Sequence, residues 1–184
     1  MTEINIPFRK GSWEDVMDSA RTTVGKDAVN REPSYAWKKR ILLAEHSPIR
    51  QLTFKWKWSN LPYWVSVHIV RHWLGILHFV STSRTDRTGI DRTKLPQDNP
   101  VDHECEANVQ ALINISRKRM CNKASKETHD AWLLVHDELC LIEPVVASVM
   151  VPECVYRGFC PEFKSCGYAS TEAFINRLKE YREV

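Results

Sequence analysis

The segment Gln51–Trp58 constrains the fold more than any other part of the chain. It reads Gln-Leu-Thr-Phe-Lys-Trp-Lys-Trp, with polar and apolar side chains in alternation. Successive side chains of a β-strand point to opposite faces, so this order predicts a half-buried strand. We expect Trp56 and Trp58 to pack in a core on one face, and Lys55 and Lys57 to lie in solvent on the other.

A helix and a second strand are predicted to follow. Pro62 stands where prolines favour the first helical position, and Leu77–Ser83 has the composition of a strand. Residues three and four apart share a helix face, so His68, Arg71 and His72 should project together. Arginine and histidine side chains in this arrangement suit a phosphorylated ligand, and a solvated basic turn is the alternative.

The rest of the chain reads as helices separated by loops. Helices are predicted from the Ser12 capping box towards residue 25, over 35–45, over 101–121, over 125–141 and after Ser170. Loops are predicted over 30–33, 85–100 and 152–167. With no repeat or linker in view, we expect one α/β domain over residues 1–184.

Composition narrows the class of partner. The net charge of +3 fits a small anionic ligand and is too weak to indicate nucleic acid. No apolar run reaches the roughly 18 residues of a membrane span, and the N-terminus lacks the apolar core of a signal peptide. We therefore expect a cytoplasmic protein without membrane contact, whose six cysteines stay reduced.

Three cysteines near the C-terminus follow one another at equal spacing: Cys154, Cys160 and Cys166. Thiolates in a short loop can hold structural zinc, with a fourth ligand from His103, Cys105 or Cys121. Reduced, buried cysteines are the interpretation favoured by the sequence, so no metal is expected. The acidic segment 102–105 is interpreted as the first turn of a helix.

Short motifs along the chain follow the order found in one enzyme family. They are Glu45-His46 before Leu52-Thr53-Phe54; Arg71-His72-Trp73 leading to Ser81-Thr82-Ser83-Arg84; Arg92-Thr93-Lys94-Leu95-Pro96; Asn108, Gln110, Asn114 and Arg119 in one helix; and Ala124-Ser125-Lys126-Glu127. This set resembles the flavin-dependent thymidylate synthases. Together with the cysteine-bearing tail, the resemblance covers residues 40–167.

The resemblance implies an antiparallel sheet flanked by helices, and an enzyme that transfers a one-carbon unit to C5 of a pyrimidine deoxynucleotide. The family is a group of methyltransferases that make dTMP from dUMP in nucleotide biosynthesis. It uses FAD, with NADPH and methylenetetrahydrofolate as co-substrates. Its members are homotetramers with sites shared between subunits, and a shortened loop makes a dimer the alternative here.

Carried over by matching position, the motifs imply three groups of site residues. The flavin would be held by Glu45, Arg71, His72, Asn108 and Asn114. The nucleotide would be held by His68, Arg71, Arg84 and Arg92. The catalytic group would consist of Arg119, polarising the pyrimidine, and either Ser81 or Ser83, which the motif leaves open.

Several positions depart from the family pattern. Trp73 replaces an arginine, Gln110 replaces another, and His78-Phe79 replace an Asn-Glu pair. If water rather than hydride ended the reaction, the product would be a 5-hydroxymethyl nucleotide, so a dUMP or dCMP hydroxymethylase is one alternative. A nucleotide- or nucleic-acid-binding protein that has lost catalysis is another. A small, divergent member would also suit a viral nucleotide-modifying pathway.

Overall fold

Four antiparallel strands form one sheet in the order β1-β2-β4-β3. The computed structural model describes residues 2–184, apart from the side chains of residues 6–8. The strands are β1 (Glu3–Lys10), β2 (Thr53–Pro62), β3 (Ile76–Val80) and β4 (Pro100–Asn108). The predicted strands at Gln51–Trp58 and Leu77–Ser83 are confirmed with shifted ends, whereas β1 was not predicted.

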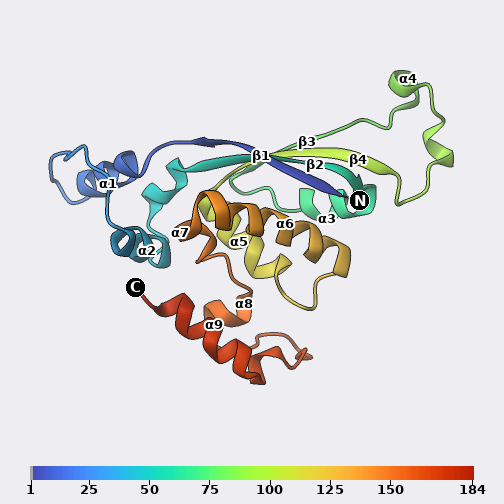
Figure 1. Cartoon of the computed structure of the whole chain (residues 1–184). Helices are drawn as coiled ribbons and strands as arrows, with labels where there is room; N and C mark the ends of the chain where they lie inside the picture. The colour runs from blue at the N-terminus through green and yellow to red at the C-terminus, as the bar shows by residue number, and fades with distance from the viewer. Residues whose placement is uncertain (1) are drawn as a thin grey trace.

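The longer helices gather on one face of this sheet (Figure 1). They are α1 (Trp13–Thr22), α2 (Tyr35–Leu43), α3 (Tyr63–Val70), α5 (Val109–Arg119), α6 (Lys126–Ile142) and α9 (Glu172–Arg182). Short turns of helix are η1 (Ser47–Gln51), α4 (Thr85–Thr88), η2 (Arg92–Lys94), α7 (Pro144–Ala147), α8 (Glu153–Arg157) and η3 (Tyr168–Ser170). In the described residues, no helix is both long and apolar enough to cross a membrane.

The helix predicted over residues 101–121 is wrong in its first half. Residues 100–108 form β4, in which Val101, His103, Cys105 and Ala107 are buried and alternate with acidic residues. This period of two is a strand pattern, and pairing with β2 and β3 decides it. The acidic residues therefore lie along a strand rather than in a first helical turn. The last helix is also capped one residue later than predicted, by Thr171 instead of Ser170.

Tryptophans from the sheet and from α6 form the centre of the core. The Trp56 ring meets Trp58 and Trp132 edge-on, at centroid distances of 5.6 and 5.9 Å. Trp58 donates its indole N–H to the Ala131 carbonyl, and Trp132 donates to the Ser116 hydroxyl. These three tryptophans and Trp13 are fully buried, as predicted for Trp56 and Trp58, because aromatic faces supply the apolar area that a one-sided sheet needs.

The opposite face of the sheet carries charged pairs. Lys55 pairs with Glu104 at 2.8 Å and Lys57 with Asp102 at 2.5 Å, and all four side chains remain partly in solvent. Exposed pairs of this kind stabilise a fold by less than about 1 kcal/mol each. The lysines are thus on the predicted face, and they are paired across the strands.

One close contact joins the start of β3 to the start of α5. Asn108 caps α5 by accepting a hydrogen bond from the Ala111 N–H at 2.9 Å, and its own N–H donates to the Gly75 carbonyl at 3.0 Å. Gly75 has a φ of +74°, and a Cβ there would lie 2.7 Å from the Asn108 amide nitrogen. Only glycine meets both requirements without strain.

We predict that Gly75→Ala destabilises the protein by about 2 to 3 kcal/mol, since it adds a clash to an unfavourable φ. Gly89→Ala is the matched control, because Gly89 has a φ of +71° but no atom within 4 Å of the added carbon. The control should lose only about 1 kcal/mol, measured by urea unfolding. Equal losses in the two variants would show that the Asn108 contact does not matter.

Candidate functional site

The C-terminal end of α3 and the C-terminal end of α5 meet through Arg119. Its Nε donates to His72 Nε2 and its Nη2 to the His68 carbonyl, both at 2.8 Å. His68 also hydrogen-bonds Thr128 at 3.0 Å and meets the Trp64 ring edge-on. We call His68, His72 and Arg119 the α3–α5 cluster. Two of the five N–H groups of Arg119 are used in these bonds, so three are left to meet a ligand.

His72 is a neutral imidazole in this cluster. Burial lowers its pKa to about 4, and the neighbouring Arg119 guanidinium and the His78 side chain contribute further to the lowering. Because arginine only donates, His72 Nε2 must be an acceptor, which places the ring proton on Nδ1. Burial, and then Arg71, also lower the pKa of Arg119, which nevertheless remains a cation. The pair therefore presents one fixed positive charge beside a hydrogen-bonding ring.

A chain of imidazoles continues from this cluster into the sheet. His78 Nε2 donates to the His72 carbonyl at 2.6 Å, and His78 Nδ1 lies 3.0 Å from His103 Nε2. The first bond fixes the His78 proton on Nε2, so His103 donates to His78 Nδ1. Cys105, which pairs with His78 across the strands, lies 3.3 Å from the same nitrogen. Burial lowers the pKa of His103 to about 4 and raises that of Cys105, so both are neutral at pH 7.

These three side chains have the composition of a metal site but not its hydrogen bonding. Their ligand atoms on His78, His103 and Cys105 lie within 4.8 Å of one another. A metal on His103 Nε2 would move the ring proton to Nδ1, which is buried and has no partner among the described residues. A buried donor without an acceptor is costly. The arrangement is better suited to orienting His78, which in turn holds the His72 carbonyl in place.

The second region is a cavity of about 450 Å³, which we call the loop cavity. It lies between the N-terminus of α3, the end of β3 and the loop 92–99. Its polar lining residues are Tyr63, Ser81, Ser83, Arg84, Arg92, Thr93, Gln97 and Asn99. The N–H groups of Tyr63 and Trp64 donate to the carbonyls of Asn99 and Gln97, so the loop satisfies the free N–H groups of the first turn of α3.

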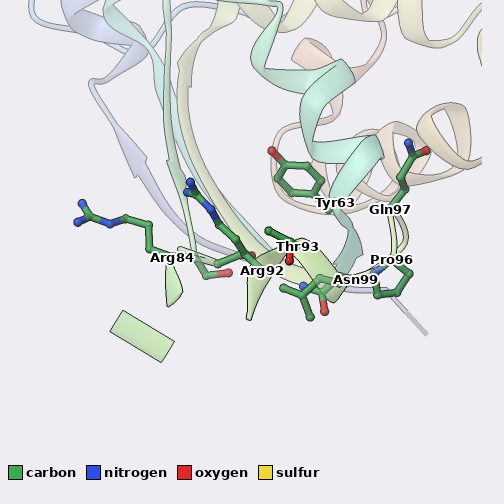
Figure 2. A pocket seen from close by; sticks show the side chains of 10 residues that line it. Tyr63, Arg84, Arg92, Thr93, Pro96, Gln97 and Asn99 are labelled. Carbon is green, nitrogen blue, oxygen red and sulfur yellow. The ribbon is translucent and has the colours of Figure 1, made fainter. Parts of the chain in front are cut away.

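Charge in the loop cavity is positive, and its two arginines differ. Arg84 is held by Asp86 through two bonds of 2.9 and 2.7 Å, and Figure 2 shows its side chain turned outward, away from Tyr63. Arg92 has no acidic partner within 4 Å in the described part of the chain. No acidic residue is among the described residues that line the cavity. Arg92 is therefore the cation most available to an anionic ligand.

The two candidate serines share the cavity wall. Ser81 is tied to β4, because its hydroxyl accepts from the Asp102 N–H at 3.0 Å and its own N–H donates to the Asp102 carbonyl. Ser83 is half-buried three residues beyond the end of β3. Both hydroxyls can donate to a ligand, so the structure leaves the choice between them open.

A third group of predicted residues forms a polar network on α5. Glu45 accepts hydrogen bonds from Gln110 and Arg117, and Asn114 accepts from the same two side chains at 3.3 Å. Arg117 also lies over the Tyr156 ring at 3.5 Å. Glu45 has a φ of +48°, a conformation that a non-glycine residue adopts only where its surroundings hold it.

The predicted residues thus fall into three places rather than one. Arg71 is exposed at the end of α3 beside the α3–α5 cluster, and Asn108 is committed to capping α5. Sequence reasoning missed Tyr63, Gln97 and Asn99 in the cavity and the contacts of His78 with His103 and Cys105. The alternation over 101–107 is the signal that would have placed His103 and Cys105 on one strand face.

Comparison with known proteins identifies the fold. No protein-family model and no curated protein matches the sequence. Two solved structures of the UMP/dUMP methylase PolB from Streptomyces cacaoi are similar to this chain. The one bound with 5-Br dUMP has a TM-score of 0.67 at 12% identity, over 86% of this chain and 96% of that chain. The one bound with 5-Br UMP has a TM-score of 0.61 at 11% identity, over 81% and 93%. The predicted fold class, an antiparallel sheet flanked by helices, is confirmed.

We predict that stability falls as the pH drops from about 6.5 to about 4. His72 and His103 have folded pKa values near 4, so only the unfolded state takes up protons in this window. His103 is fully buried, and its titration alone should lower the free energy of unfolding by about 2 kcal/mol between pH 7 and pH 5. Urea unfolding at pH 7 and pH 5 measures this loss.

His103→Gln is the control for that loss, because its side chain cannot titrate. It should be less stable than the parent protein at pH 7 but lose less stability on going to pH 5. Ring resonances of His72 and His103 that titrate near pH 6.5 in NMR spectra would contradict the prediction.

Proposed function

We propose that this chain binds a pyrimidine nucleotide in the loop cavity and modifies it at C5. The observation that carries the proposal is that two separate sequence motifs, Ser81–Arg84 and the one beginning at Arg92, line the same positively charged cavity. Arginine and hydroxyl donors without acids are what a phosphate requires. The similarly folded PolB structures, bound with 5-Br dUMP and 5-Br UMP, support this class of ligand.

The reaction we propose is one-carbon transfer, dUMP to dTMP or a close variant. Negative charge must develop on the pyrimidine, as an enolate formed by addition at C6, before C5 can attack a one-carbon donor. Arg119 is suited to stabilise that charge, because His72 and the His68 carbonyl hold its guanidinium in one orientation. The neutral His72 ring adds no second charge that would compete for the same position.

The residues near the end of α3 fit a flavin. Arg71 is an exposed cation and His72 a polar ring. The Asn108 amide, whose oxygen caps α5, presents its nitrogen towards Gly75, three residues after His72. A flavin dinucleotide needs such donors for its diphosphate and ring edge. FAD, when bound, would supply the hydride and carry the one-carbon unit, with NADPH and methylenetetrahydrofolate as co-substrates.

The site we propose is completed by a second copy of the chain. The loop cavity is at the N-terminus of α3 and Arg119 at its C-terminus, and eight residues of helix separate these ends by roughly 12 Å. Exposed apolar side chains follow α3 and continue along β3: Trp73, Leu74, Leu77 and Phe79. Such a patch on a folded surface favours self-association, and we expect a homotetramer or a dimer.

We predict that Arg92→Ala weakens dUMP binding about 10- to 100-fold, the effect of losing one charged hydrogen-bond donor to phosphate. Affinity for deoxyuridine, which lacks the phosphate, should change little. Arg87→Ala is the matched control, because Arg87 is an exposed arginine of the same loop that does not line the cavity. Calorimetric titration measures the affinity of Arg92→Ala for dUMP and for deoxyuridine, and the affinity of Arg87→Ala for dUMP. A similar loss for deoxyuridine would place Arg92 away from the phosphate.

A shared site predicts complementation. At a dUMP concentration well below its Kd for the Arg92→Ala variant, Arg92→Ala and Arg119→Ala should each have little activity alone. Co-expression should restore about a quarter of the activity, since half of random pairs are mixed and each mixed pair holds one intact site. Expressing Arg92→Ala with the double variant is the control and should stay inactive. No recovery in confirmed mixed oligomers would show that one chain supplies both arginines.

The proposed reaction is tested by the visible spectrum and the product. Purified protein with FAD should show flavin bands that shift when dUMP or dCMP is added, and the full mixture should convert that nucleotide. A 5-hydroxymethyl product would identify a hydroxymethylase instead. A colourless protein that binds nucleotide or nucleic acid without FAD would identify the binding protein without catalysis.

A further inference from the structure

Four of the six cysteines come together at one place outside the sites described above. Cys121 follows the end of α5, Cys154 lies in α8, and Cys160 and Cys166 lie in the segment after α8. All four line a cavity of about 20 Å³. A space of that size holds a single ion or water molecule.

The fold settles which residue joins the three tail cysteines. His103 and Cys105 lie on β4 in the sheet, engaged with His78, and do not line this cavity. Cys121, just beyond the end of α5, lines the cavity together with Cys154, Cys160 and Cys166. The sequence left the fourth ligand open, and α5 brings Cys121 to that position.

The segment 158–167 has little else to hold it. It forms no helix or strand, begins and ends with Gly158 and Gly167 at positive φ, and exposes every residue from 161 to 167, including Phe163. A ten-residue irregular segment without buried apolar side chains needs another link to the body of the protein. A metal bridging it to Cys121 and Cys154 would provide that link.

We propose that Cys121, Cys154, Cys160 and Cys166 bind one Zn²⁺ as a structural tetrathiolate site. On binding, four S–H bonds break, four Zn–S bonds form, and the four protons pass to solvent. The four sulfurs are not gathered within 4.8 Å of one another, as the ligand atoms of His78, His103 and Cys105 are, so the sulfurs must move together to bind the ion. No oxidant or reductant takes part. Because Cys121 is two residues beyond Arg119, the metal also anchors the end of α5 that reaches His72.

The test measures metal directly and needs no enzymatic activity. Protein purified under reducing conditions should contain one zinc per chain by elemental analysis. Replacement by Co²⁺ should give the visible bands of a tetrahedral thiolate site and a near-ultraviolet sulfur-to-cobalt band. Removal of zinc by a chelator should lower the unfolding temperature, and added zinc should restore it.

Variants separate this site from adventitious binding. Cys121→Ser and Cys166→Ser should each reduce zinc content about tenfold or more and abolish the sulfur-to-cobalt band. Cys140→Ser is the matched control, because Cys140 is an exposed cysteine of α6 outside the cluster, and it should retain both. Wild-type protein that lacks zinc and gives no cobalt bands, or that links two of the four cysteines in a disulfide, would overturn the proposal.

Discussion

The packing of Trp132 on α6 against Trp56 and Trp58 on β2 is the contact on which the rest of the structure depends. It covers one face of the sheet and sets the distance between sheet and helices. With that layer fixed, β4 runs directly into α5, which Asn108 caps. Trp132 on α6 donates a hydrogen bond to Ser116 on α5 and so holds the two helices together. Arg119 at the end of α5 then meets His68 in the last turn of α3 and His72 just beyond it.

Helix α3 links the two regions that we assign to function. Its first turn is joined to the loop that closes the cavity, and its last turn meets Arg119. Between these ends, Val65 and Ile69 are buried in the core, so the helix is a rigid spacer. Our proposal of a site shared between two copies of the chain rests on this spacing, with a fixed cation at one end of α3 and a positively charged cavity at the other.

Local patterns predicted those elements whose own side chains decide their conformation. The alternation before Trp58, the Ser12 capping box and Pro62 before α3 each predicted a feature that is present. The same reasoning failed at β4, because Val101–Asn108 joins a helix without a break and its polar residues fit a helical first turn as well. Pairing with β2 and β3, which local sequence does not specify, makes it a strand. Strand β1 was missed for the same reason, since it depends on pairing with β2.

The sequence by itself determined which chemical groups this protein has: arginines, imidazoles and hydroxyls in an ordered set, and a tail of cysteines. The tertiary structure decided which of them meet. It brought Ser83 and Arg92 to one cavity, turned Arg84 outward onto Asp86, and gave the three tail cysteines Cys121 as a fourth. Motif spacing fixes positions along the chain, whereas these contacts depend on how the sheet and helices pack, and that packing is a property of the whole core.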